Sequence, residues 1–129
     1  MLPAQLPGVT DNIKVRSVIG RFLEHSRVFY FRLDGEEQLY LSSADWMNRN
    51  MLRRVELAWP VTDASLRQRI VDECLVAYLQ DDRDAWDLMP DGHYKRVKGA
   101  GEPKGHGAQD ALMARYTAPD GQEQEGTWT

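Results

Sequence analysis

The sequence contains one cysteine, Cys74, and no long apolar run. A single cysteine cannot form an internal disulfide, and no cysteine or histidine spacing matches a zinc site, so nothing indicates an oxidising compartment or a structural metal. No stretch approaches the roughly 18 apolar residues that span a bilayer, and the N-terminus lacks the basic start and apolar core of an export signal. We expect a cytoplasmic protein with no transmembrane segment, and membrane association within a complex is left open.

Positive charge is in the minority overall, but it is unevenly distributed. The net charge of −4 argues weakly against a general nucleic-acid binder. Between Lys14 and Arg54, however, basic side chains outnumber acidic ones. The basic residues are Lys14, Arg16, Arg21, Arg27, Arg32, Arg49, Arg53 and Arg54, and the acidic ones are Glu24, Asp34, Glu36, Glu37 and Asp45. The first half of the chain can therefore face an anion.

The length of 129 residues allows one domain, and 42% hydrophobic with 28% charged residues is typical of a folded globular protein. Residues 1–11 are rich in proline, glycine and aspartate and are predicted to be a severed linker or an extended lead into the domain. The domain itself is predicted over residues 12–117. The polar tail, residues 118–129, is expected to be disordered.

Hydrophobic periodicity predicts a mixed α/β domain. Residues 28–31 are β-branched and aromatic and are expected to form a hairpin with residues 38–41 across a turn at Asp34 and Gly35. Residues 54–59 alternate and predict another strand that ends at Pro60. Apolar positions from Leu66 to Leu79 recur at helical spacing behind a cap at Thr62 or Asp63, so this long helix must cover one face of the sheet.

The flanking segments give weaker signals. Residues 13–17 alternate in polarity, and Pro90 to Gly92 is a turn signal that precedes a short edge strand at residues 93–97. Residues 99–105 are too rich in glycine to be regular, whereas residues 108–116 contain good helix formers. Cys74 falls on the apolar face of the long helix and is expected to be buried there.

His25 lies just before the predicted strand at residues 28–31. A residue at the mouth of a strand can project into a cleft while the strand holds its main chain. Imidazole titrates near neutral pH, and it can donate or accept a proton or carry a phosphoryl group on nitrogen. Arg27 lies on the same side if the strand has already begun, which would place a permanent cation beside the histidine. Such a pair favours neutral imidazole and attracts an anion.

Polar and basic side chains follow the returning arm of the hairpin. The set is Ser42, Ser43, Arg49 and Asn50. Their hydroxyl, guanidinium and amide groups are suitable donors to phosphate oxygens. Arg53 and Arg54 continue the set, but alternation along the predicted strand places them on opposite faces, so at most one should join the cleft.

Each of these residues also has a plain structural interpretation. A histidine beside a strand more often serves packing than catalysis, serines before Asp45 more often cap a turn, and surface arginines are usually solvated. The chemistry of the segment alone indicates an anion-binding cleft and no particular reaction. His93 and His106 lie in turn-rich segments, and we expect both to be solvent-exposed and without a function.

Two runs of sequence resemble one known family closely. Residues 11–31 read DNIKVRSVIGRFLEHSRVFYF and residues 40–50 read YLSSADWMNRN. Further similarity appears in AWDL at residues 85–88, DGHY at residues 91–94 and AQDALM at residues 108–113. Together these segments resemble, in order, the last domain of the long polyphosphate kinases.

The resemblance implies a phospholipase D-like fold, in which two similar domains each contribute a histidine to one site. It implies transfer of the terminal phosphoryl group of ATP, reversibly, to polyphosphate through a phosphohistidine, with Mg²⁺ accompanying the ATP and bound by ligands outside this chain. His25 matches the second histidine, a proton donor or acceptor and phosphate ligand. Arg54 matches an arginine implied to contact phosphates, and Arg27 stands where phospholipase D relatives carry lysine.

The resemblance also implies partners, namely ATP, polyphosphate and the upstream domains of the same enzyme, and a homo-oligomer in the full-length form. We expect the isolated chain to be an incomplete enzyme. Two other hypotheses remain. One is a non-catalytic module of the same fold that binds polyphosphate or other anions or serves assembly. The other is a phospholipase D-type nuclease or phosphatidyl transferase, which would require dimerisation because only one such histidine segment is present.

Overall fold

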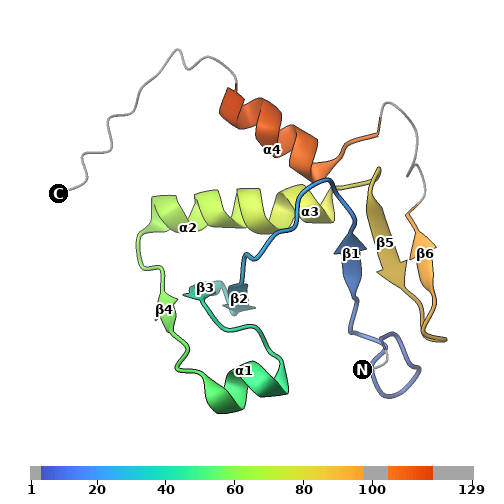
Figure 1. The fold of residues 1–129 in the computed structure, drawn as a ribbon, viewed down its shortest axis with the longest axis horizontal. Coiled ribbons are helices and arrows are strands. Elements are labelled where there is room, and N and C mark those ends of the chain that lie inside the picture. The colour runs from blue at the N-terminus through green and yellow to red at the C-terminus, as the bar shows by residue number, and fades with distance from the viewer. Residues whose placement is uncertain (1–3, 98–104, 118–129) are drawn as a thin grey trace.

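The structure is a computed structural model that describes residues 4–97 and 105–117 (Figure 1). The predicted tail at residues 118–129 and most of the glycine-rich stretch at residues 99–105 lie outside these ranges. The elements follow in the order β1 (Arg16–Val18), β2 (Val28–Leu33), β3 (Glu36–Ser42), α1 (Asn48–Arg53), β4 (Ala58–Pro60), α2 (Ala64–Ile70), η1 (Val71–Val76), α3 (Ala77–Leu79), β5 (Ala85–Leu88), β6 (Tyr94–Arg96) and α4 (Ala108–Thr117). The chain is therefore an α/β domain, as predicted.

The strands form two small sheets, and the single mixed sheet expected from the sequence is wrong. One sheet has the order β1-β5-β6 and the other β2-β3-β4, and every pairing is antiparallel. The central strand β5 was not predicted, because four residues of mixed polarity give too little periodicity to recognise. β5 is the strand that pairs with both β1 and β6. Because β5 was not recognised, the sequence did not predict a separate sheet.

The predicted hairpin is confirmed as β2 and β3, which pair from Val28 opposite Leu41 to Leu33 opposite Glu36. Asp34 and Gly35 form its turn with φ of 49° and 84°. Positive φ at both central positions suits the right-handed twist of a hairpin, and aspartate and glycine tolerate it better than most residues. The hairpin fixes the direction in which the chain enters β2, directly after His25.

The predicted long helix is also confirmed. It begins after Asp63, whose side-chain Oδ1 accepts a hydrogen bond from the Leu66 backbone N–H at 2.8 Å. It continues through α2, a π-helical stretch η1 and α3 to Leu79. In Figure 1 this helix runs across the molecule with α4 on one side and β2, β3 and β4 on the other, while β1, β5 and β6 stand beyond its α3 end. Arg67 ties it to the second sheet by donating to the Glu37 carbonyl oxygen at 3.4 Å.

The strand predicted at residues 54–59 is wrong over most of its length. Residues 54–57 form no strand; α1 ends at Arg53, immediately before them, and the Arg54 N–H donates to the Asn50 carbonyl oxygen at 3.2 Å at the helix end. Methionine, leucine and arginine favour the helix locally, whereas strand pairing begins only at Ala58, opposite Ser42. Arg53 and Arg54 therefore lie at the end of a helix and not on the two faces of a strand.

The turn, edge strand and helix predicted in the C-terminal part of the chain are confirmed. Gly92 has a φ of 86° within the predicted turn, β6 follows it as a short edge strand, and α4 occupies the predicted helix.

The Arg16 side chain links β1 to the rest of the structure. Its guanidinium donates to Asp87 at 2.8 Å across the β1–β5 pair and to the Leu79 carbonyl oxygen at 2.6 Å. The first sheet is thereby joined to the end of the long helix.

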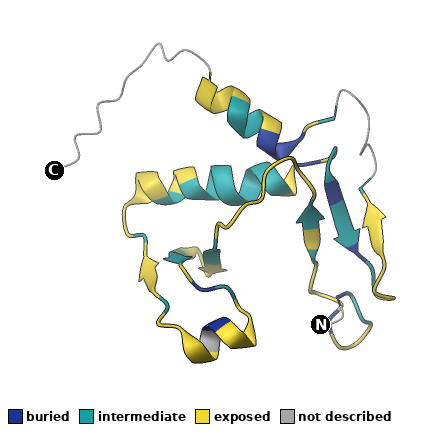
Figure 2. Cartoon of the chain, viewed as in Figure 1, coloured by how far each residue is buried: buried dark blue, intermediate teal, exposed yellow. Residues whose placement is uncertain are grey.

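The deepest polar side chain is Asp81, which is 1% exposed and lies between the long helix and β5. Its Oδ1 accepts from the N–H groups of Arg83 at 3.0 Å and Asp84 at 2.7 Å, and its Oδ2 accepts from the Ala108 N–H at 2.7 Å. Figure 2 shows the neighbouring buried surface at the start of α4 and along β5. One carboxylate thus holds the turn after the helix and the first residue of α4 together.

Large apolar side chains remain exposed elsewhere in the described chain. Val55 is 95%, Leu23 86%, Leu52 82%, Leu33 76% and Trp46 74% exposed. The buried apolar residues are mostly small, namely Ala4, Leu39, Ala44, Ala85, Leu88 and Ala108. Within the described ranges no helix is long and apolar enough to cross a membrane.

We predict that Asp81→Ala lowers the free energy of unfolding by roughly 2–4 kcal/mol, because it leaves three N–H groups without their acceptor. Asp63→Ala, which removes an exposed helix cap, is the matched control and should cost about 1 kcal/mol. Urea unfolding followed by circular dichroism measures both. Equal losses for the two variants would contradict the structural role of Asp81.

Candidate functional site

The segment between β1 and β2, residues 19–27, has no helix or strand and carries His25. Apolar and polar residues are mixed here without period, so neither a helix nor a strand is stabilised, and the segment crosses from one sheet to the other. The His25 side chain is exposed. Regular structure begins three residues later at Val28, whose partner is Leu41. The sequence therefore placed His25 correctly at the mouth of the strand, and its ring is not sealed in apolar packing.

Arg27 contacts the backbone of His25 and not its ring. The guanidinium Nη1 donates to the His25 carbonyl oxygen at 2.8 Å, and Nη2 lies 3.6 Å from the Asp45 carboxylate. The predicted alternation of His25 and Arg27 does not apply, because the strand has not begun at either residue. Arg27 instead folds back on the main chain, and Asp45 offsets part of its positive charge.

The hydroxyls of Ser42 and Ser43 close the loop between β3 and β4. Ser42 Oγ donates to the Leu57 carbonyl oxygen at 3.0 Å and accepts from the Ala44 N–H at 3.0 Å. Ser43 Oγ donates to the Glu56 carboxylate at 2.6 Å and accepts from the Leu57 N–H at 3.0 Å. Both serine hydroxyls thus stabilise the loop, which is the structural alternative to the phosphate-binding role predicted from the sequence.

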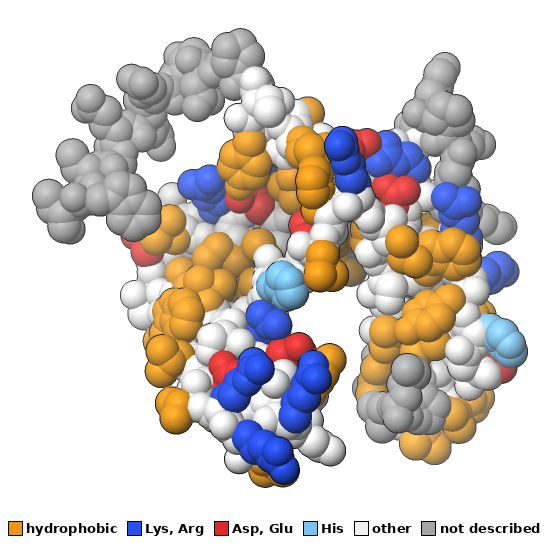
Figure 3. Space-filling view, in the orientation of Figure 1, with side chains coloured by type: hydrophobic (Ala, Val, Ile, Leu, Met, Phe, Trp, Pro, Cys, Tyr) orange, Lys and Arg blue, Asp and Glu red, His pale blue; other side chains and the backbone are white. Residues whose placement is uncertain are grey.

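The remaining predicted residues lie on or beside α1. Arg49 and Arg54 are exposed, whereas Asn50 is only 3% exposed and is turned into the structure. Figure 3 shows Lys and Arg side chains gathered over α1 on the face in view. Because α1 contains no acidic residue, its exposed arginines keep a local excess of positive charge. That excess is what an anionic ligand requires.

Hydrogen bonds connect the His25 segment to the Arg54 segment in steps. Arg27 bonds to His25 through its side chain, and its carbonyl oxygen accepts from the Ser42 N–H at 3.0 Å. Ser42 and Ser43 then hold Leu57, three residues beyond Arg54. Among the described residues, His25 and Arg54 share no hydrogen bond. The structure therefore brings the two segments to the same end of the β2–β3 hairpin without joining the two side chains.

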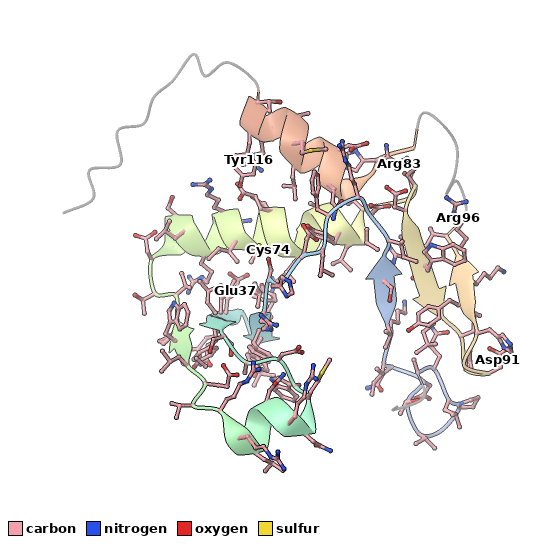
Figure 4. All side chains as sticks on the ribbon, viewed as in Figure 1. Glu37, Cys74, Arg83, Asp91, Arg96 and Tyr116 are labelled. Atoms are coloured by element: carbon pink, nitrogen blue, oxygen red, sulfur yellow. The ribbon has the colours of Figure 1, made fainter. Side chains whose placement is uncertain are left out.

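A cavity of about 610 Å³ lies on the other side of the His25 segment. The segment, the long helix and α4 line it, through Phe22, Glu24, Cys74, Tyr78 and Gln109 among others. Figure 4 shows Cys74 on the long helix and Tyr116 on α4, the two helices that flank it. At this cavity, the main chain that precedes His25 lies beside side chains of the long helix and α4, which are distant in sequence.

Two titratable groups that line this cavity, Cys74 and Tyr78, have pKa values shifted away from their charged forms. Burial, followed by the neighbouring carboxylates of Glu73 and Glu24, raises the pKa of the Cys74 thiol, so Cys74 is a half-buried and weakly reactive thiol. Burial and a hydrogen bond to Glu24 raise the pKa of the Tyr78 hydroxyl. Tyr78 is consequently a neutral donor to a residue adjacent to His25.

Sequence reasoning missed the side chains that hold the His25 segment, above all Gln109 and Tyr78. Gln109 bonds to Phe22 across 87 positions and Tyr78 bonds to Glu24 across 54 positions. No periodicity links residues so distant, and both positions read as ordinary helix residues. Across the residues that the structure describes, no group of three His, Cys, Asp or Glu side chains is arranged to hold a metal.

Comparison with known proteins gives one consistent family. The family model described as polyphosphate kinase C-terminal domain 2 matches residues 1–109. The chain is 49% identical to a polyphosphate kinase of Burkholderia multivorans over 111 residues, or 86% of the chain, and 52% identical to one of Pseudomonas putida over 114 residues, or 88% of the chain. It spans 16% of the length of each of these proteins.

A solved structure agrees with the sequence matches. The crystal structure of polyphosphate kinase from Porphyromonas gingivalis superposes with a TM-score of 0.71 at 37% identity, covering 83% of this chain and 16% of that one. The matched range contains His25, Arg54 and the α1 arginines. Because a family model and close relatives match most of its length, the chain belongs to the polyphosphate kinase C-terminal domain 2 family.

Proposed function

We propose that this chain is the C-terminal part of a polyphosphate kinase of phospholipase D-like fold, which transfers the terminal phosphoryl group of ATP reversibly to polyphosphate. The observation that carries the proposal is the exposed His25 at the mouth of β2, within the range matched by the family. The names of the relatives favour this role over a non-catalytic anion-binding module.

The proposed reaction proceeds in two displacements. A histidine outside this chain attacks the γ-phosphorus of ATP, so that a phosphorus–nitrogen bond forms and the bond to the leaving ADP oxygen breaks. A terminal oxygen of polyphosphate then attacks the same phosphorus and releases the histidine. His25 supports this exchange as a proton donor or acceptor and as a ligand of the transferred phosphate, because its imidazole is exposed and imidazole nitrogens can donate or accept a proton.

Arginine side chains at the same end of the β2–β3 hairpin as the His25 segment would supply the positive charge that phosphoryl transfer requires. The exposed guanidinium groups of Arg54 and Arg49 can each donate to phosphate oxygens without losing a proton. Arg27 has a smaller share, because Asp45 and the His25 carbonyl oxygen already engage its guanidinium. Ser42, Ser43 and Asn50 would shape the loop that presents Arg54, since the serine hydroxyls bond to Leu57 and Glu56 and Asn50 is buried.

Other parts of the proposed enzyme lie outside the chain. Magnesium reaches the site with the ATP phosphates and is bound by ligands elsewhere. The upstream domains of a longer enzyme supply the phosphorylated histidine, and the full-length enzyme acts in the cytoplasm as a homo-oligomer. The chain by itself holds one half of a composite site.

We predict that His25→Ala abolishes polyphosphate synthesis while leaving the fold intact. The test is a chimera in which this chain replaces the segment of the Pseudomonas putida polyphosphate kinase that it matches. Incorporation of labelled γ-phosphate from ATP measures the activity, and circular dichroism measures the fold. His25 makes no side-chain hydrogen bond among the described residues, so its loss should not destabilise the domain.

The matched control is His93→Ala, which removes an equally exposed histidine from a turn and should retain activity. Full turnover by the folded His25→Ala chimera would contradict the proposed role. An unmodified chimera that binds polyphosphate without turnover would instead support the anion-binding module.

We further predict that Arg54→Ala lowers kcat/KM of the chimera by about 100-fold, the usual effect of removing one contact to developing charge. Arg53→Ala is the control, because Arg53 precedes it on the same helix and is equally exposed. It should change kcat/KM less than threefold, on the order of a surface substitution. Steady-state assays over a range of ATP concentrations measure both, and equal losses would indicate a diffuse charge effect with no specific contact by Arg54.

A further inference from the structure

The irregular segment that carries His25 is held by side chains from outside it. Gln109 of α4 makes the most complete contact. Its Oε1 accepts from the Phe22 N–H at 2.9 Å, and its Nε2 donates to the Phe22 carbonyl oxygen at 2.8 Å. One side-chain amide thus satisfies both backbone groups of a residue three positions before His25, as a neighbouring strand would.

The Gln109 contact is partly shielded from water, because Gln109 is buried while Phe22 is half exposed. Gln109 is 8% exposed, whereas the backbone that it holds belongs to a segment with no other regular pairing. A hydrogen bond shielded from water is stronger than an exposed one, and a buried group that loses its partner carries the full cost of desolvation. The Phe22 backbone is consequently fixed at the position that α4 dictates.

Two further features show that the local structure is matched to Gln109. A Cβ atom added to Gly20 would overlap the Gln109 side-chain amide, so the chain can pass this close only with glycine at position 20. The position of Gln109 is itself set by Asp81, which accepts from the N–H of the preceding Ala108 at 2.7 Å. The clamp consists of Gly20, Phe22, Asp81, Ala108 and Gln109.

Two other anchors hold the main chain beside His25, one on each side of it. Before it, Glu24 accepts a hydrogen bond from Tyr78 of α3. After it, Arg27 donates to the His25 carbonyl oxygen, and the Arg27 carbonyl oxygen accepts from the Ser42 N–H. The main chain is therefore tied on both sides of an exposed imidazole, and Gln109 is the buried anchor on the upstream side.

We propose that Gln109 is a positioning residue for His25, acting through the Phe22 backbone from 87 positions away. This inference rests on the proposed function, because Gln109 can position His25 for phosphoryl transfer only if His25 takes part in that reaction. Gln109 does not touch the phosphates in this scheme. It limits the conformations of the segment, so that the imidazole meets the transferred phosphoryl group in one orientation, and small displacements of a reacting group are costly.

The first experiment measures kinetics in the same chimera. Gln109→Ala should lower kcat by about 10- to 100-fold while KM for ATP changes less than twofold, because the arginines that bind phosphates are untouched. Asp63→Ala is the control for general destabilisation, since it removes a hydrogen bond on a distant helix end and should leave kcat unchanged. A loss of stability with unchanged kcat, or a change confined to KM, would overturn the positioning role.

The second experiment tests the coupling inside the clamp. Gly20→Ala should reproduce the fall in kcat, because the added Cβ displaces the Gln109 amide. The double variant Gly20→Ala with Gln109→Ala should be no worse than either single variant, as expected for two changes that break one contact. Additive losses in kcat would show that Gly20 acts independently of Gln109 and would overturn the clamp.

The third experiment needs no activity and uses the 129-residue chain itself. Cys74 lines the same cavity as Phe22, Glu24 and Gln109, and it is the chain's one thiol. Gln109→Ala should raise its rate of alkylation by iodoacetamide about fivefold or more, an order-of-magnitude expectation for loss of a local anchor. An unchanged rate would overturn the idea that Gln109 restrains the segment. The alkylation rate tests the clamp without any enzyme activity, whereas the His25→Ala chimera tests only the proposed enzyme function.

Discussion

The carboxylate of Asp81 is the contact on which the arrangement of this domain depends. It accepts three backbone hydrogen bonds from two parts of the chain and so fixes the start of α4 against the turn that leaves the long helix. A buried carboxylate is stable only when its oxygens are well satisfied, and three N–H donors meet that requirement without a paired cation. Because α4 carries Gln109, this contact also determines where the backbone of the His25 segment can lie.

At the candidate site, some polar and charged groups are engaged in contacts within the fold, and others remain exposed to solvent. Arg27 is partly neutralised by Asp45, and the two serine hydroxyls are occupied in the loop that returns to β4. The exposed arginines of α1 and Arg54 keep their donors available to solvent. An anion approaching this face would therefore meet exposed guanidinium groups at a helix end, beside a loop whose polar contacts are already made.

Elements with strong local signals were predicted well, and those that depend on distant partners were not. The β2–β3 hairpin, the Asp63 cap, the long helix and α4 follow from periodicity and turn chemistry in short windows. The strand expected at residues 54–59 is only partly right, because alternation does not reveal where strand pairing begins, and β4 starts at Ala58, opposite Ser42. The place of His25 was predictable from the strand that follows it. Its anchors were not, since contacts across 54 and 87 positions leave no pattern in sequence.

The second sheet leaves one of its edges and much apolar surface uncovered. Among the described strands β2 pairs with β3 alone, and the Phe31 and Leu33 side chains on β2 are 56% and 76% exposed. An open strand with hydrophobic side chains is a template for backbone pairing with another chain. When this domain is handled in isolation at high concentration, β2 is consequently the place where strand-to-strand association between copies begins. A lysine introduced at Leu33 would discourage that association, since it faces solvent and lies at the end of the strand, away from His25.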